Sequence, residues 1–120
     1  MNKRVSTYES EALSLLAYEF PFTDNTETDR KIKGRLKRKK LGAFDSERIA
    51  LLRRLKNELQ EEIGKFAKSR YFTEQHGEYA DIRDFDVPRL TTDMSERYPQ
   101  IPKGEIESFV PFCVLVYYLL

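Results

Sequence analysis

The chain has 120 residues, 40% of them hydrophobic and 34% charged, and its 21 basic and 20 acidic residues leave a formal net charge of +1. This length allows one domain with a small core, and the charge balance excludes a uniformly basic or acidic protein. The charges are nevertheless segregated. Residues 1–29 hold 2 basic and 6 acidic residues (net −4), residues 30–70 hold 15 and 5 (net +10), and residues 71–120 hold 4 and 9 (net −5).

The first predicted helix covers residues 7–20. Ser6 and Glu9 have the spacing of a capping box, in which each side chain satisfies a free N–H group of the other residue. Apolar side chains then recur at intervals of three or four residues, and Pro21 ends the pattern.

A second helix is predicted over residues 27–40, with Thr26 as its N-cap. Acidic residues in its first turn and basic residues in its last turn interact favourably with the helix dipole. Its apolar face is thin and consists essentially of Ile32 and Leu36. We therefore expect this helix to be marginally stable on its own.

The strongest helical pattern covers residues 45–71. Asp45 is a good N-cap, and the apolar residues from Ile49 to Phe66 follow steps of three or four. At about 1.5 Å per residue such a helix would be roughly 40 Å long, which is long for a chain of this size. We expect it to be the central helix of the fold.

Residues 72–104 are punctuated by prolines and predict one short helix, over residues 92–98. Residues 103–120 fit a helix that begins after Pro102, although their β-branched and tyrosine residues also suit a strand. Helix is the preferred interpretation because no strand partner is evident elsewhere. The predicted fold is mainly α: a small single-domain bundle of four to five helices over residues 1–120, with an apolar C-terminal helix.

The sequence favours a cytoplasmic protein that does not contact membranes. The longest apolar run, residues 109–120, is too short for a bilayer, which needs about 20 residues. The single cysteine, Cys113, excludes an intrachain disulfide. Acidic residues also interrupt the N-terminal apolar stretch that a secretory signal would need.

The chain offers little for catalysis. It has one histidine, His76, and no nucleophile elbow, Walker loop or dinucleotide-binding motif. Cys113 lies in an apolar run, which predicts an inert buried thiol. The acidic segment 74–86 could hold a divalent cation, but it lacks the calcium-loop pattern, and a solvated acidic loop is the preferred interpretation. We predict no enzyme, no catalytic residue, no cofactor and no metal.

The main functional candidate is the basic segment, residues 30–56, which has eight cations within residues 30–40. Three interpretations stay open: neutralisation by the protein's own acidic ends, contact with an acidic protein partner, and contact with nucleic-acid phosphates. The predicted contact residues are Lys31, Lys33, Arg35, Lys37, Arg38, Lys39, Lys40, Arg48, Arg53 and Arg54.

We expect a non-enzymatic protein-interaction module, such as a small regulator, an adaptor or an inhibitor of the immunity-protein type. The alternative is a nucleic-acid-binding regulator that uses the same residues. Lysine and arginine alone give phosphate affinity, whereas Asn57 and Gln60 lie beyond the first turns from which a recognition helix reads bases. Any of Tyr71, Phe72 and Tyr79 that is exposed would be a candidate anchor. The long helix and the apolar C-terminus also permit a homodimer.

Overall fold

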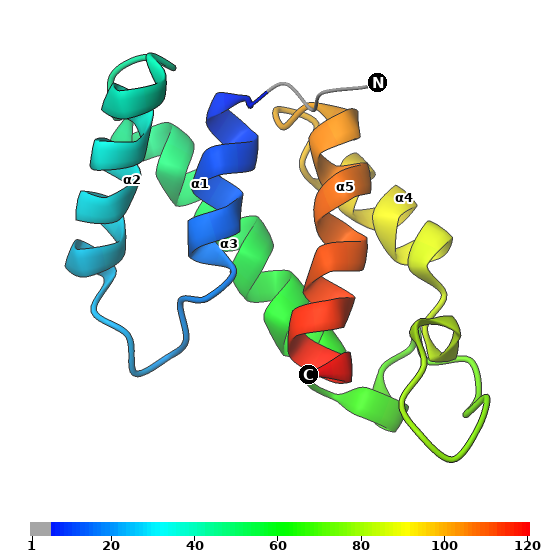
Figure 1. The fold of residues 1–120 in the computed structure, drawn as a ribbon. Helices are drawn as coiled ribbons and strands as arrows, with labels where there is room; N and C mark the ends of the chain where they lie inside the picture. The colour runs from blue at the N-terminus through cyan, green and yellow to red at the C-terminus, as the bar shows by residue number, and fades with distance from the viewer. Residues whose placement is uncertain (1–5) are drawn as a thin grey trace, which may run out of the picture. The chain divides into compact units, whose positions relative to one another are not determined.

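The computed structural model describes residues 6–120. This part of the chain contains five α-helices, and its only β-feature is a bridge between Phe72 and Phe85 (Figure 1). The predicted mainly α fold is therefore confirmed. The backbone packs as two compact units, Met1–Arg53 and Arg54–Leu120, which we describe one at a time. The prediction of a single domain stays a prediction.

The first unit begins with helix α1, Tyr8–Leu16. A capping box starts the helix one residue later than predicted: Thr7 Oγ1 accepts the Ser10 N–H at 3.0 Å, and Ser10 Oγ accepts the Thr7 N–H at 2.9 Å. The helix ends four residues before its predicted end because the chain turns, and the Glu19 N–H donates to the Leu16 carbonyl. This turn brings the Glu19 carboxylate into the interior of the unit.

Helix α2, Asn25–Lys39, lies beside α1 (Figure 1). Its N-cap is Asp24, whose Oδ1 accepts the Thr26 N–H at 2.9 Å, so the helix begins two residues before its predicted start. Ile32 and Leu36 are fully buried, as their spacing predicts. Together with Thr28 they form the buried side of α2.

A short connection joins α2 to α3, Ser46–Ile63. Lys40 ends α2 in the left-handed conformation with φ 56°, and Gly42 follows at φ 110°, where glycine is favoured. Asp45 then caps α3 as predicted, because its Oδ1 accepts the N–H groups of the helix's second and third residues at 3.1 and 3.2 Å.

Helix α3 ends at Ile63, eight residues before the predicted end, and its 18 residues span about 27 Å. The next element is the 3₁₀ turn η1, Phe66–Lys68, and Phe66 has φ 52°. A bulky residue rarely adopts this left-handed conformation, which an α-helix cannot contain. The predicted helix was too long because Phe66 keeps the apolar spacing, although its side chain is half exposed.

The core of the first unit is formed by the apolar faces of α1, α2 and the first half of α3. Tyr8 closes one side of this core, and its hydroxyl accepts the Asp45 N–H at 2.8 Å. The other buried side chains of the three faces include Ala12, Leu13, Leu16, Ile32, Leu36, Ile49 and Leu52.

The second unit contains helix α4, Val87–Arg97, which begins five residues before the predicted start at residue 92. Asp86 caps this helix by accepting the Arg89 N–H at 3.2 Å. Pro88 was interpreted as a break, but it lies in the first turn, where its missing N–H has no cost. At the other end of α4, the Tyr98 hydroxyl donates to Glu58 Oε1 of α3 at 2.7 Å.

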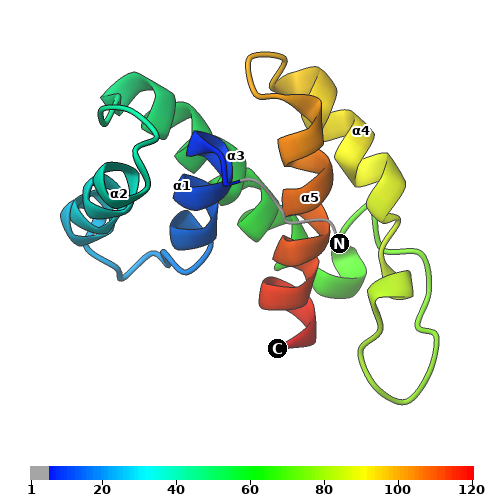
Figure 2. The same ribbon diagram turned by 45° about the horizontal axis from the view of Figure 1, so that its top comes forward.

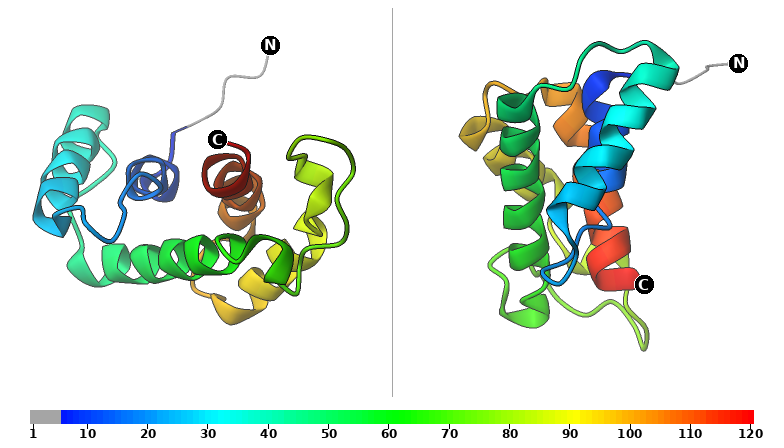
Figure 3. Two further views of the ribbon diagram at one scale, coloured as in Figure 1. Left: turned by 90° about the horizontal axis from the view of Figure 1, so that it is seen from below. Right: turned by 90° about the vertical axis from the view of Figure 1, so that its left-hand side faces the viewer.

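The C-terminal segment is helical, which decides between the helix and strand interpretations. Helix α5, Lys103–Val114, packs beside α4 (Figure 2) and continues as the π-helical turns of η3, Leu115–Leu119 (Figure 3). Pro111 lies inside α5 and cannot donate a backbone hydrogen bond. Cys113 is buried in this helix, as predicted, and burial raises the pKa of its thiol well above the ordinary value.

The core of the second unit is formed by the second half of α3 together with α4 and α5. Its buried side chains include Leu55, Leu59, Ile63, Leu90, Met94, Ile106, Val110 and Val114. Among the described residues, no helix combines the length and the apolar character that crossing a membrane requires.

We expect Gly34→Ala to raise the free energy of unfolding by about 0.5–1 kcal/mol, because alanine loses less backbone entropy in a helix interior. A Cβ atom at Gly34 would meet no atom within 4 Å. The matched control is Gly42→Ala, which also has open space but must adopt φ 110° and should lower the same free energy. Urea unfolding measures both values, and a destabilised Gly34→Ala chain would contradict this account of α2.

Candidate functional site

The cations of the basic segment divide into two groups. One group forms ion pairs with acidic residues of the first unit. Arg35 Nη1 lies 3.0 Å from Glu11 Oε1, and Lys39 Nζ lies 3.5 Å from Glu11 Oε2. Burial opposes ionisation of Glu11, but the hydrogen bond from Arg35 and the charge of Lys39 outweigh it and lower the pKa of this carboxyl.

Arg53 is the most deeply embedded of the paired cations. Its guanidinium binds Glu19 through two hydrogen bonds of 2.7 and 2.9 Å and Asp29 through a third of 2.7 Å. The Glu19 residue is only 3% exposed, and its hydrogen bonds to Arg53 are the main cause of the raised pKa of the guanidinium. Arg53 therefore connects the turn after α1, helix α2 and helix α3 within the first unit.

Arg48 is paired in a similar way at the other end of α1. Its Nε donates to Glu9 Oε2 at 2.7 Å, and its guanidinium lies 3.8 Å from the centroid of the Tyr8 ring. This stacking combines an ion pair with a cation–π contact. Arg35, Lys39, Arg48 and Arg53 are among the predicted partner contacts, and the structure shows each of them in an ion pair within the first unit. Their role as contact residues stays a prediction.

The second group forms the basic face of α2, and all of its members are exposed. Because Thr28, Ile32 and Leu36 mark the buried side of the helix, these cations project from its other sides. Lys31 lies 3.8 Å from Glu27, and Lys33 lies 5.0 Å from the centroid of the Phe44 ring. The basic face of α2 consists of Arg30, Lys31, Lys33, Lys37, Arg38 and Lys40.

Helix α3 adds little to this basic face. Its first turn exposes Glu47 and the capping residue Asp45, both of them acidic. Arg54 is exposed on α3 but belongs to the second unit. Lys56 is only 2% exposed, and its Nζ lies 3.4 Å from Gln60 Oε1. The exposed positive charge of the basic segment is therefore concentrated on α2.

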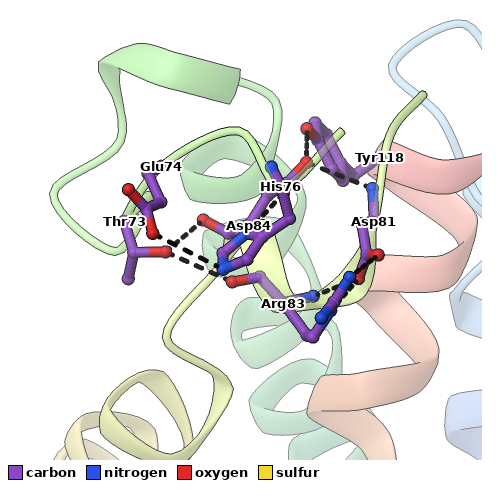
Figure 4. A network of polar contacts seen from close by, with 7 residues as sticks. All are labelled: Thr73, Glu74, His76, Asp81, Arg83, Asp84 and Tyr118. Atoms are coloured by element: carbon purple, nitrogen blue, oxygen red, sulfur yellow. Dashed lines mark hydrogen bonds and ion pairs between the residues drawn. The ribbon is translucent and has the colours of Figure 1, made fainter. Parts of the chain in front are cut away.

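A network of polar contacts in the second unit centres on the Asp84 carboxylate, which is fully buried (Figure 4). It accepts the Tyr118 hydroxyl at 2.5 Å, the His76 N–H at 2.9 Å and the Asp81 N–H at 3.1 Å. His76 Nδ1 also lies 2.9 Å from Asp84 Oδ1. These contacts fix the turns of the loop over residues 73–86 and attach the loop to the end of the C-terminal helix.

The network shifts the acid–base behaviour of its members. The pKa of Asp84 lies well below its usual range, and the main cause is the hydrogen bond from Tyr118. The effect of this hydrogen bond is larger than the opposing effect of burial. Burial and the hydrogen bond to Asp84 raise the pKa of Tyr118 to about 12. At the exposed edge, hydrogen bonds from Arg83 lower the pKa of Asp81 to about 2.

Aromatic rings pack around the same point. The Tyr118 ring centroid lies 4.9 Å from that of Phe85, 5.9 Å from that of Phe66 and 6.4 Å from that of Phe72. The contact of Tyr118 with Asp84 was not predictable from the sequence, because the two residues are 34 positions apart and neither carries a pairing signal. Within residues 6–120, no set of three or more potential metal ligands gathers around one point.

A shallow depression of about 330 Å³ also lies on the second unit. Its walls are the charged side chains of Arg70, Asp93, Glu96 and Arg97. Tyr71 is buried, and its hydroxyl donates to Asp93 at 2.5 Å. Tyr71 is therefore not an exposed anchor. Phe72 is half buried, whereas Tyr79 is 80% exposed.

Comparisons with protein-family models, with curated proteins and with solved structures gave no match.

We expect Arg53→Gln to lower the free energy of unfolding by about 3 kcal/mol, because it leaves the buried Glu19 carboxylate without its cation. The matched control is Arg38→Gln, which removes a charge from the basic face of α2 and should change the value by less than about 0.5 kcal/mol. Urea unfolding at neutral pH measures both. Equal effects of the two substitutions would contradict the division into paired and exposed cations.

We expect Asp84→Asn to destabilise the chain at neutral pH and to remove part of its loss of stability in acid. The pKa of Asp84 is lower in the folded chain than the usual carboxyl value of 3.8. Its contribution to the free energy of unfolding is therefore complete well above pH 3.8 and is lost as the pH falls below that value. Denaturant unfolding between neutral and acid pH measures this difference.

The same substitution should lower the pKa of Tyr118 from about 12 towards 10, because the neighbouring negative charge disappears. Absorbance of the tyrosinate during alkaline titration reports this value, and Tyr118→Phe identifies which transition belongs to Tyr118. Tyr118→Phe should itself cost about 2 kcal/mol, as expected for a hydrogen bond to a charged group. An unchanged Tyr118 transition in Asp84→Asn would show that Asp84 does not cause the shift.

Proposed function

We propose that this protein is a non-enzymatic protein-interaction module that binds an acidic protein surface through the basic face of α2. The observation that carries the proposal is the separation of the cations. Arg35, Lys39, Arg48 and Arg53 form ion pairs with acidic residues of the first unit, although the side chains of Lys39 and Arg48 are 41% and 44% exposed. The six cations of the basic face of α2 are exposed, and only Lys31 among them lies near a carboxylate described in the structure, that of Glu27. Glu27 is the one acidic residue of α2 outside the Arg53 network.

Such a surface favours fast and selective association with a partner of opposite charge. Apolar contact must supply much of the affinity, and Phe22 is suited to this role. It lies directly before α2, is 88% exposed, and stacks on Phe20 with 6.0 Å between the ring centroids. A regulator, an adaptor or an inhibitor of the immunity-protein type would act in this way. The single buried cysteine, Cys113, supports a reducing compartment such as the cytoplasm as its location.

Nucleic-acid binding is the second candidate, supported by the density of cations on α2. In a helix–turn–helix protein the second helix reads bases with its first turns. Here the corresponding helix would be α3, but its first turn carries the carboxylates of Asp45 and Glu47, and Arg48 and Arg53 are paired internally. These features favour a protein partner over base recognition.

The test measures binding of a fluorescent poly-L-glutamate peptide and of a random-sequence DNA duplex. We expect the peptide to bind at low salt and the charge reversal Lys37→Glu/Arg38→Glu to weaken this binding about tenfold. The matched control is Lys68→Glu/Lys103→Glu, which makes the same charge change at two exposed lysines of the second unit and should have little effect. Fluorescence anisotropy provides both dissociation constants.

Two outcomes would overturn the proposal. If neither probe binds at low salt, or if both reversals weaken binding equally, the basic face of α2 is not a docking surface. If the duplex binds at physiological salt more tightly than about 1 μM, beyond the usual non-specific range, the nucleic-acid candidate replaces the protein partner.

A further inference from the structure

We propose that the partner of the basic face of α2 is the acidic loop of a second copy of this chain, so that copies associate head to tail. The acidic loop is defined as residues 74–79, and its exposed side chains include Glu74, Glu78 and Tyr79. This inference rests on the function proposed above, because it names the occupant of the same docking surface.

The acidic loop is held in place from the inside. Asp84 binds both the N–H and the Nδ1 atom of His76, and the Thr73 N–H donates to the Asp84 carbonyl at 2.7 Å (Figure 4). Glu74 lies next to this network, yet its side chain is 77% exposed, with 3.9 Å between its carboxylate and His76 Nε2. The Glu74 carboxylate is therefore exposed beside a hydrogen-bonded turn, and its binding would have little ordering cost.

No lysine or arginine within residues 73–86 neutralises Glu74 or Glu78, although Glu74 lies 3.9 Å from His76 Nε2. Arg83 is the only lysine or arginine there, and its guanidinium is bound to Asp81 at 2.8 Å. Arg83 is therefore engaged with a carboxylate other than those of Glu74 and Glu78. The exposed surface of the loop is consequently negative.

The two units of the chain have opposite charge. Met1–Arg53 contains 12 basic and 8 acidic residues, a net charge of +4, and Arg54–Leu120 contains 9 and 12, a net charge of −3. Each copy thus carries both a positive and a negative surface. Charge complementarity between different copies favours contact between the first unit of one and the second unit of the next.

Tyr79 gives this contact a specific anchor. It is 80% exposed, and an aromatic ring can lie against the aliphatic stem and the ammonium group of a lysine. Lys33 already makes such a contact with Phe44, which shows that cations of α2 can lie over an aromatic ring. In the proposed interface, Tyr79 inserts between the cations of α2 while Glu74 and Glu78 pair with Lys37 and Arg38.

A contact between two different surfaces closes in a two-fold dimer when both surfaces pair reciprocally, and otherwise produces rings or open chains. In each case the mean mass should rise with concentration. Because the contact depends on exposed charges, association should weaken strongly as salt increases.

The experiment is sedimentation velocity of the full chain over a range of concentrations at low and high salt. At low salt we expect the mean mass to rise from the monomer value of 14.2 kDa to at least twice that value. Either Lys37→Glu/Arg38→Glu or Glu74→Lys/Glu78→Lys should return it to the monomer. Tyr79→Ala, which changes no charge, should weaken association about tenfold.

Two combinations test the pairing itself. A chain that carries both reversals has its charges exchanged and should associate again. An equimolar mixture of the two singly reversed chains should also associate, because the unchanged face of one pairs with the unchanged loop of the other and the reversed face pairs with the reversed loop. Lys68→Glu/Lys103→Glu is the charge-matched control and should associate like the natural sequence.

A monomer under all conditions, or association that survives both reversals, would overturn this inference. If the chain is monomeric but its α2 cations still bind poly-L-glutamate, only self-association fails and the proposed function stands. If the chain neither associates with itself nor binds poly-L-glutamate, both this inference and the proposed function fail.

Discussion

A carboxylate that leaves water must find cationic or hydrogen-bonding partners, and Glu19 meets this requirement through Arg53. The Glu19–Arg53–Asp29 network joins three segments of the first unit that are distant in sequence. Because α2 has few apolar residues, this network compensates for the thin hydrophobic face of that helix. It also fixes the rotation of α2, with Ile32 inward and its free cations outward. The exposed charge of α2 thus follows from a buried ion pair.

The helices were predictable where local chemistry determines them. The caps and apolar spacing located α1, α2 and the start of α3 to within about two residues at their N-terminal ends. The errors occurred where local and tertiary preferences differ. Phe66 continues the apolar spacing of α3 but lies in a left-handed turn, and Pro88 begins a helix instead of interrupting one. In both cases the residue type allows two structures, and the caps and packing around it select one.

The basic segment could be recognised from the sequence, but its cations could not be sorted into paired and exposed ones. Charge clustering could not separate Arg53 from Arg38, because both look like exposed cations in a charged helix. Their difference depends on Glu19, which lies 34 residues before Arg53. The Asp84 network was missed for the same reason: Tyr118 approaches the acidic loop only through the packing of the C-terminal helix.

In both units a buried carboxylate organises the charged residues around it, but the charges left at the surface have opposite signs. In the first unit, buried carboxylates bind some of the cations and leave the others on α2. In the second, the buried Asp84 organises a loop whose remaining carboxylates point to solvent. The net charge of +1 is small because two charged surfaces offset each other in the total, not because charge is evenly mixed. Exposed charges of opposite sign on the two units are the physical basis of the proposed association, and they are the reason why it should depend on salt.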